Sequence, residues 1–103
     1  GQGQRWVRDR IVLMNALAEH YVGHSIRVTA VVKDSPFHRE GEAFDVGRMS
    51  AATQANTDWT LYDFEVMEPI WLEHRIPLVI VNKGQDNEHY HVGDVATLLY
   101  ERE

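Results

Sequence analysis

Two short segments of the sequence bring together side chains that bind metal ions. The segment SPFHREGEAFDV carries His38 and Asp45, and the segment NEHYHV carries His89 and His91. Imidazole and carboxylate groups are ligands of zinc, and a set of two histidines and one carboxylate leaves a fourth position for water. Either segment alone is more often a surface ion pair or a hydrogen-bonded histidine than a metal site. Together, the two segments predict a metal site with hydrolytic chemistry.

Hydrolysis at such a site also needs a general base, and Glu88 is the candidate because it lies beside the second pair of histidines. Side chains alternate along a strand, so His89 and His91 share one face while Glu88 and Tyr90 point to the other, unless the strand end is twisted or bulged. From the strand pattern, His89 is an exposed or hydrogen-bonded strand histidine. A second interpretation rests on resemblance alone: related proteins with a His-x-His motif use the first histidine beside the metal, where it would orient water or stabilise an oxyanion. Tyr90 is a candidate substrate contact.

The elements that must position these residues follow from the apolar pattern. Apolar residues at three- and four-residue steps predict a helix over 6–21 that stops at Gly23. A second helix is expected over 59–67, with Pro69 interrupting it and a separate turn after the proline. Strands are expected over 25–33, 43–46, 77–82 and 88–92, and Asp94 is expected to cap a short final helix. The pattern predicts an α+β domain with a small, largely antiparallel sheet covered by helices on one side.

Composition limits the classes of protein to which this chain can belong. The 103 residues, 44% hydrophobic and 25% charged, suit one globular domain spanning 1–103, and residues 1–4 resemble a processing scar. A formal net charge of −6 argues against nucleic acid as a partner. The apolar stretches are too short for membrane insertion. The absence of cysteine leaves histidine and carboxylate as the ligands for any metal.

The spacing of both segments resembles a known enzyme family. His38 to Asp45 matches the motif HxxGxAxD, and Glu88 to His91 matches ExxH, in the order found in the zinc D-Ala-D-Ala carboxypeptidases and L-Ala-D-Glu endopeptidases. That family has the Hedgehog/DD-peptidase fold and includes phage endolysins. The resemblance covers residues 26–92. It implies that His38, Asp45 and His91 bind Zn²⁺ and that Glu88 is the general base.

Two positions depart from the family's pattern. The family has a serine two residues before the first ligand, whereas Ser35 stands three residues before His38. Despite this shift of one residue, the resemblance implies that Ser35 contacts the substrate. The family also has an arginine after the preceding strand, and Lys33 stands at the matching place. Lysine supplies a point charge in place of a planar fork, so Lys33 is expected to stabilise the oxyanion less tightly than arginine would.

The resemblance implies a zinc metallopeptidase that acts on the stem peptides of bacterial peptidoglycan, as a phage lysis enzyme or an enzyme of the cell envelope. The residues do not separate carboxypeptidase from endopeptidase specificity. An alternative is an inert zinc-binding module of a virion or cell-wall assembly, which the lysine in place of arginine favours. A further alternative is a globular domain without metal in which both motifs arose by chance.

Overall fold

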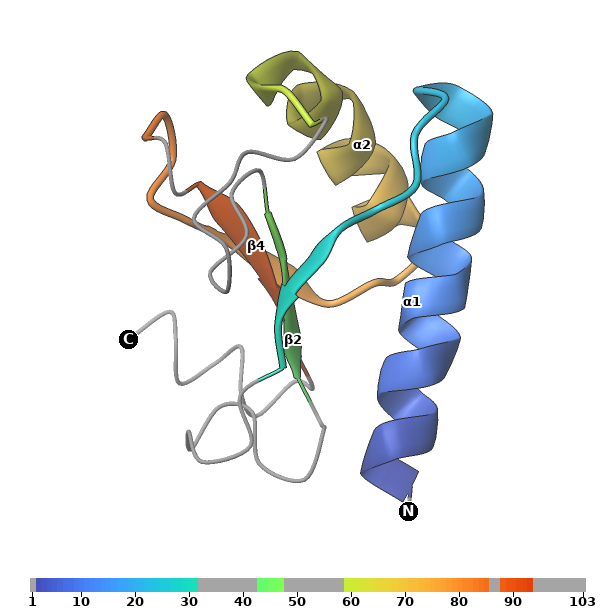
Figure 1. The fold of residues 1–103 in the computed structure, drawn as a ribbon. Helices are drawn as coiled ribbons and strands as arrows, with labels where there is room; N and C mark the ends of the chain where they lie inside the picture. Colours follow the sequence, from blue (N-terminus) through green and yellow to red (C-terminus); the bar gives the residue numbers. More distant parts are fainter. Residues whose placement is uncertain (1, 32–42, 48–58, 86–87, 94–103) are drawn as a thin grey trace.

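The computed structural model describes residues 2–31, 43–47, 59–85 and 88–93 (Figure 1). These residues form two helices and four strands. In chain order they are α1 (Gln2–Tyr21), β1 (Val28–Ala30), β2 (Phe44–Gly47), α2 (Leu61–Glu73), β3 (Leu78–Val81) and β4 (His89–Val92). The predicted α+β class is confirmed. The helix expected after Asp94 lies outside the described residues.

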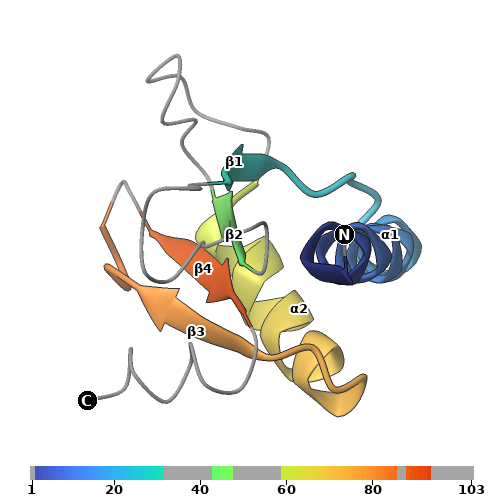
Figure 2. The ribbon, with the colours of Figure 1, turned by 90° about the horizontal axis from the view of Figure 1, so that it is seen from below.

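The strands form one antiparallel sheet in the order β1-β2-β4-β3, as predicted for a largely antiparallel sheet. Figure 2 shows β2 and β4 lying side by side in its centre. Their register pairs Asp45 with His91 and Gly47 with His89. This order places Asp45 and His91, two of the expected metal ligands, on neighbouring strands, although they are far apart in the sequence.

One face of the sheet packs against both helices. The residues of this core that come from β2 and β4 are Phe44, Val46, Tyr90 and Val92. They pack with Met14 and Ala18 of α1 and with Phe64, Met67 and Trp71 of α2. Because side chains alternate along a strand, the intervening residues of β2 and β4 occupy the opposite face of the sheet. Among the described residues, both helices pack on one face, as predicted, and on the other face β2 and β4 carry Asp45, His89 and His91.

Helix α1 ends where the apolar pattern stops. Gly23 has φ +78, a left-handed conformation that glycine adopts without steric penalty, and its N–H donates to the carbonyl of Ala18 at 3.1 Å. The helix begins at Gln2, earlier than the apolar pattern indicates. Neither described helix has the length and apolar character needed to cross a membrane.

Helix α2 begins at a capping box and continues through its proline. The Thr60 hydroxyl accepts from the N–H of Asp63 at 3.2 Å, and the Asp63 carboxylate accepts from the N–H of Thr60 at 3.0 Å. The predicted interruption at Pro69 is wrong, because α2 runs unbroken to Glu73. Pro69 and Glu65 are both exposed, so the Glu65 carbonyl that loses its helical donor lies on the solvent side of the helix.

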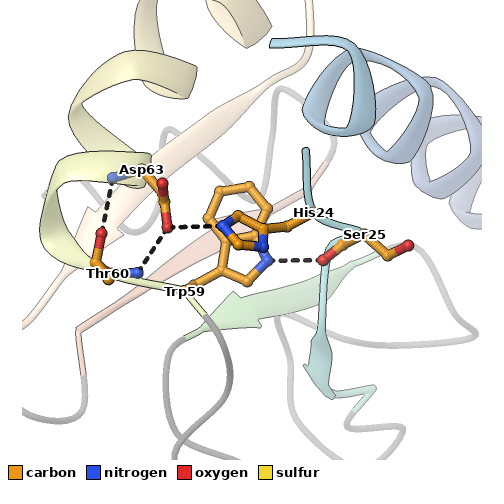
Figure 3. Close-up of polar contacts among 5 residues, drawn as sticks. All are labelled: His24, Ser25, Trp59, Thr60 and Asp63. Atoms are coloured by element: carbon orange, nitrogen blue, oxygen red, sulfur yellow. Dashed lines mark hydrogen bonds and ion pairs between the residues drawn. The ribbon is translucent and has the colours of Figure 1, made fainter. Parts of the chain in front are cut away.

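The start of α2 is tied to the connection between α1 and β1 (Figure 3). The Asp63 carboxylate lies 3.5 Å from Nε2 of His24, and the indole N–H of Trp59 donates to the Ser25 carbonyl at 2.7 Å. The Ser25 hydroxyl donates to Glu19 at 2.8 Å. Ser25, His24 and Asp63 therefore do not form a nucleophilic triad. Their contacts join the start of α2 to the connection between α1 and β1.

Candidate metal centre

The pairing of β2 with β4 brings Asp45 and His91 into contact. The two residues are directly opposite each other in the antiparallel ladder, so their side chains leave the same face of the sheet. Nδ1 of His91 lies 3.2 Å from Oδ1 of Asp45. The His91 side chain is 3% exposed and that of Asp45 is 15% exposed. Two of the three expected zinc ligands thus meet in a largely buried position.

His89 joins this pair from the same face of β4. Its Nε2 lies 3.9 Å from Oδ2 of Asp45, and its side chain is 25% exposed. The predicted alternation along the strand is confirmed, because His89 and His91 both face Asp45 while Tyr90 packs in the core on the other side. Asp45 therefore lies between two imidazole rings.

The distance between the facing atoms of Asp45 and His91 is close to the distance between two ligand atoms on one zinc ion. Zinc binds imidazole nitrogen and carboxylate oxygen at about 2.0 to 2.2 Å in a tetrahedral arrangement, which separates two ligand atoms by about 3.3 Å. The observed 3.2 Å between Nδ1 and Oδ1 is close to that value. The same distance also lies within the range of an N–H···O hydrogen bond between the imidazole and the carboxylate.

The remaining expected ligand is not among the residues just described. His38 lies outside the described part of the chain, as do Lys33 and Ser35. Within the described ranges, no group of three or more histidine, cysteine, aspartate or glutamate side chains is arranged to hold a metal ion. The Asp45 carboxylate and the His91 imidazole are in contact. They would supply two of the three protein ligands that a zinc site of this kind requires.

Glu88 occupies the side of β4 on which Tyr90 lies. It is 2% exposed, and its Oε2 accepts a hydrogen bond of 2.8 Å from the N–H of Gly84. Glu88 and Tyr90 line a cavity of about 130 Å³ between α2 and the β3–β4 turn, together with Phe64 and Lys83. The structure thus brings Glu88 to Gly84 and to this cavity, and it brings Asp45, His89 and His91 together on the opposite face.

Tyr90 is a core residue that borders the same cavity. It is 1% exposed, and its ring packs edge-to-face against Phe64 at 4.8 Å. Burial raises the pKa of the Tyr90 phenol far above its ordinary value, and the carboxylates of Glu68 and Glu88 raise it further. The phenol therefore stays neutral throughout the physiological range. Tyr90, expected as a substrate contact, thus lies in the core and borders the cavity instead of lying at the surface.

Two glycines support the site, and sequence reasoning did not single out either of them. Gly47 lies opposite His89, where a Cβ atom would stand 3.1 Å from Cβ of His89. Gly84 has φ +81 in the turn before Glu88. The sequence NKGQ is typical of a tight turn, so a left-handed glycine was predictable there. The role of Gly47 depends on strand register, which the sequence does not show.

Comparison of this chain with known protein families, with curated proteins and with solved structures found no match.

Proposed function

We propose that this chain is a zinc metallopeptidase that hydrolyses peptide bonds in the stem peptides of bacterial peptidoglycan. The observation that carries this proposal is the contact between Asp45 and His91, which lie on different strands and belong to two different motifs. The motif HxxGxAxD ends at Asp45, and ExxH ends at His91. The last residue of each motif therefore meets the other at a distance suited to one shared ion.

Asp45, His91 and His38 would hold the ion. A zinc ion bound by them would polarise a peptide carbonyl and lower the pKa of a coordinated water to about 7. Glu88 would take up the water's proton and deliver it to the leaving amine. Because the Gly84 amide holds one oxygen of this carboxylate on the Tyr90 side of β4, Glu88 would have to leave this bond to reach a water beside Asp45 and His91. Lys33 would stabilise the negative charge that develops on the substrate's carbonyl oxygen.

The substrate class comes from the resemblance to the D-Ala-D-Ala carboxypeptidases and L-Ala-D-Glu endopeptidases. Both reactions are amide hydrolyses of short peptides, and neither needs a covalent intermediate when an activated water attacks directly. The same resemblance supports a place among the Hedgehog/DD-peptidase folds, and the antiparallel sheet with its two motif strands side by side is compatible with that placement. A phage lysis enzyme or a cell-envelope enzyme would have this chemistry.

A second function, an inert zinc-binding module of a virion or cell-wall assembly, is favoured by the position of Glu88. Its carboxylate lines the cavity on the Tyr90 side of β4, whereas Asp45 and His91 lie on the other face. A general base must come within hydrogen-bond reach of the water that it deprotonates. If Glu88 keeps this position in the presence of zinc and substrate, the protein would bind the metal without turnover.

Mass spectrometry of peptidoglycan fragments distinguishes the two functions. Purified muropeptides are incubated with the zinc-loaded protein, with a Glu88→Gln variant, and with Glu73→Gln as a matched control at the exposed end of α2. The peptidase should release new fragments, whose masses separate D-Ala release from cleavage after L-Ala. We expect Glu88→Gln to lose about 10²-fold or more in rate, the range of general acid–base catalysis, and Glu73→Gln to match the wild type. Zinc-loaded wild-type protein that leaves every fragment intact would favour the inert module.

A further inference from the structure

The two oxygens of the Asp45 carboxylate face different histidines. Oδ1 lies 3.2 Å from Nδ1 of His91, and Oδ2 lies 3.9 Å from Nε2 of His89. A carboxylate that binds zinc through one oxygen keeps part of its negative charge on the other oxygen. In metal sites, that second oxygen is commonly held by a hydrogen-bond donor in the surrounding shell. Nε2 of His89 faces this second oxygen of Asp45.

Gly47 makes room for His89 at this position. It is buried directly opposite His89 in the β2–β4 ladder. A Cβ atom at residue 47 would stand 3.1 Å from Cβ of His89 and 3.2 Å from Oγ1 of Thr29, closer than side chains normally pack. Glycine thus allows His89 and the neighbouring strand β1 to approach β2. A larger residue would have to push the imidazole away from its present place beside Asp45.

We infer that His89 is a positioning residue that orients Asp45 for the ion. This inference rests on the proposed zinc site and adds a residue to it. His89 differs from the proposed ligand His91 in the carboxylate oxygen that it faces. His89 faces Oδ2 of Asp45, whereas His91 contacts Oδ1. The 3.9 Å separation is longer than a hydrogen bond. A small rotation of either side chain lets the ring donate an Nε2–H to Oδ2 once Oδ1 binds the metal.

Metal affinity measures this role without any dependence on turnover. Loss of a hydrogen-bond partner behind a metal ligand typically weakens metal binding by about 10- to 100-fold. His89→Ala should therefore bind zinc about 10- to 100-fold more weakly than the wild type. His89→Gln should recover part of this loss, because its side-chain amide keeps an N–H donor. Gly47→Ala should weaken binding in the same direction, because it displaces His89 without removing a donor.

The experiment is a zinc titration of the metal-free full chain in competition with a chromophoric chelator. His20→Ala, which removes an exposed histidine at the end of α1, is the matched control and should bind as the wild type does. A His89→Ala affinity within about threefold of the wild type would overturn the inference, since the hydrogen bond from His89 to Asp45 would then contribute nothing to metal binding. A loss beyond about a thousandfold would also overturn it, because His89 would then be a ligand. A wild type that does not bind zinc would refute the proposed site itself.

Melting temperatures identify any variant that fails to fold. If Gly47→Ala does not fold, His89→Ala and His89→Gln still test the inference.

Discussion

At the residue scale, the chemistry of this chain depends on which face of a strand each side chain takes. In β4, residues 89 and 91 face Asp45, whereas Tyr90 faces the core. The alternation was predictable from a short strand in which polar and aromatic residues alternate. The contact of Asp45 with His91 was not predictable from that pattern, because a shift of one residue in the β2–β4 register would separate them.

The buried phenol of Tyr90 leads to a prediction about alkaline pH. Its pKa is raised in the folded chain, first by burial and then by nearby carboxylates, while the unfolded chain titrates at about 10. A group with a raised pKa stabilises the fold below the unfolded value, and this stability is lost as the pH rises above it. We therefore expect the free energy of unfolding to fall above about pH 10, by up to about 1.4 kcal/mol per pH unit.

Two substitutions test that alkaline effect by urea unfolding across pH. Tyr90→Phe should lower stability near neutral pH by about 1 kcal/mol, because it removes the hydroxyl's hydrogen bonds, and should make the alkaline decline less steep. Tyr62→Phe is the control, since Tyr62 is 70% exposed. An equal alkaline decline in wild type and Tyr90→Phe would show that Tyr90 does not cause it.

At the element scale, the turn before β4 holds Glu88 through one left-handed glycine. Gly84 has φ +81 and donates to Oε2 of Glu88, and a Cβ atom there would meet nothing within 4 Å. Gly23 at the end of α1 is a matched site, with φ +78 and equally open surroundings. Alanine at either position incurs the left-handed backbone penalty, about 1 to 2 kcal/mol. Both glycine N–H groups donate a hydrogen bond, that of Gly23 to the Ala18 carbonyl and that of Gly84 to the Glu88 carboxylate. The comparison therefore sets a bond to a buried carboxylate against a bond to a backbone carbonyl.

We expect Gly84→Ala to destabilise the chain by about 1 kcal/mol more than Gly23→Ala does. Relaxation of φ at residue 84 turns the peptide plane that carries its N–H, and the buried carboxylate of Glu88 then loses a donor. The excess should shrink when Gly84→Ala is combined with Glu88→Gln, as a double-mutant cycle in urea unfolding would show. An excess that persists unchanged in the double variant would mean that the Gly84–Glu88 bond contributes little.

Much of the element pattern was predictable from local sequence, and the exceptions have physical causes. The apolar periodicity of α1, its glycine stop and the β-branched run of β3 each predict the observed element. Pro69 was expected to break α2, yet the helix continues because the freed carbonyl lies at an exposed surface while Met67 and Trp71 pack in the core. Tertiary packing outweighed the local effect of proline there.

At the scale of the whole molecule, the candidate site is a product of strand order. Asp45 and His91 are 46 residues apart in sequence and meet because β4 inserts between β2 and β3. The sequence alone indicates four strands and an antiparallel tendency, but not this order. The pairing of two motifs across the central strands is therefore the structural result that local patterns do not contain.

The zinc content of the purified chain tests the central claim most directly. After equilibrium dialysis against zinc, the wild type should retain one zinc ion per chain, and Asp45→Ala and His91→Ala should each lose it, because a carboxylate or an imidazole ligand is removed. Asp9→Asn, an exposed carboxylate on α1, should keep the ion. Wild-type protein that retains no zinc, or Asp45→Ala and His91→Ala variants that retain it fully, would contradict a metal centre built on Asp45 and His91.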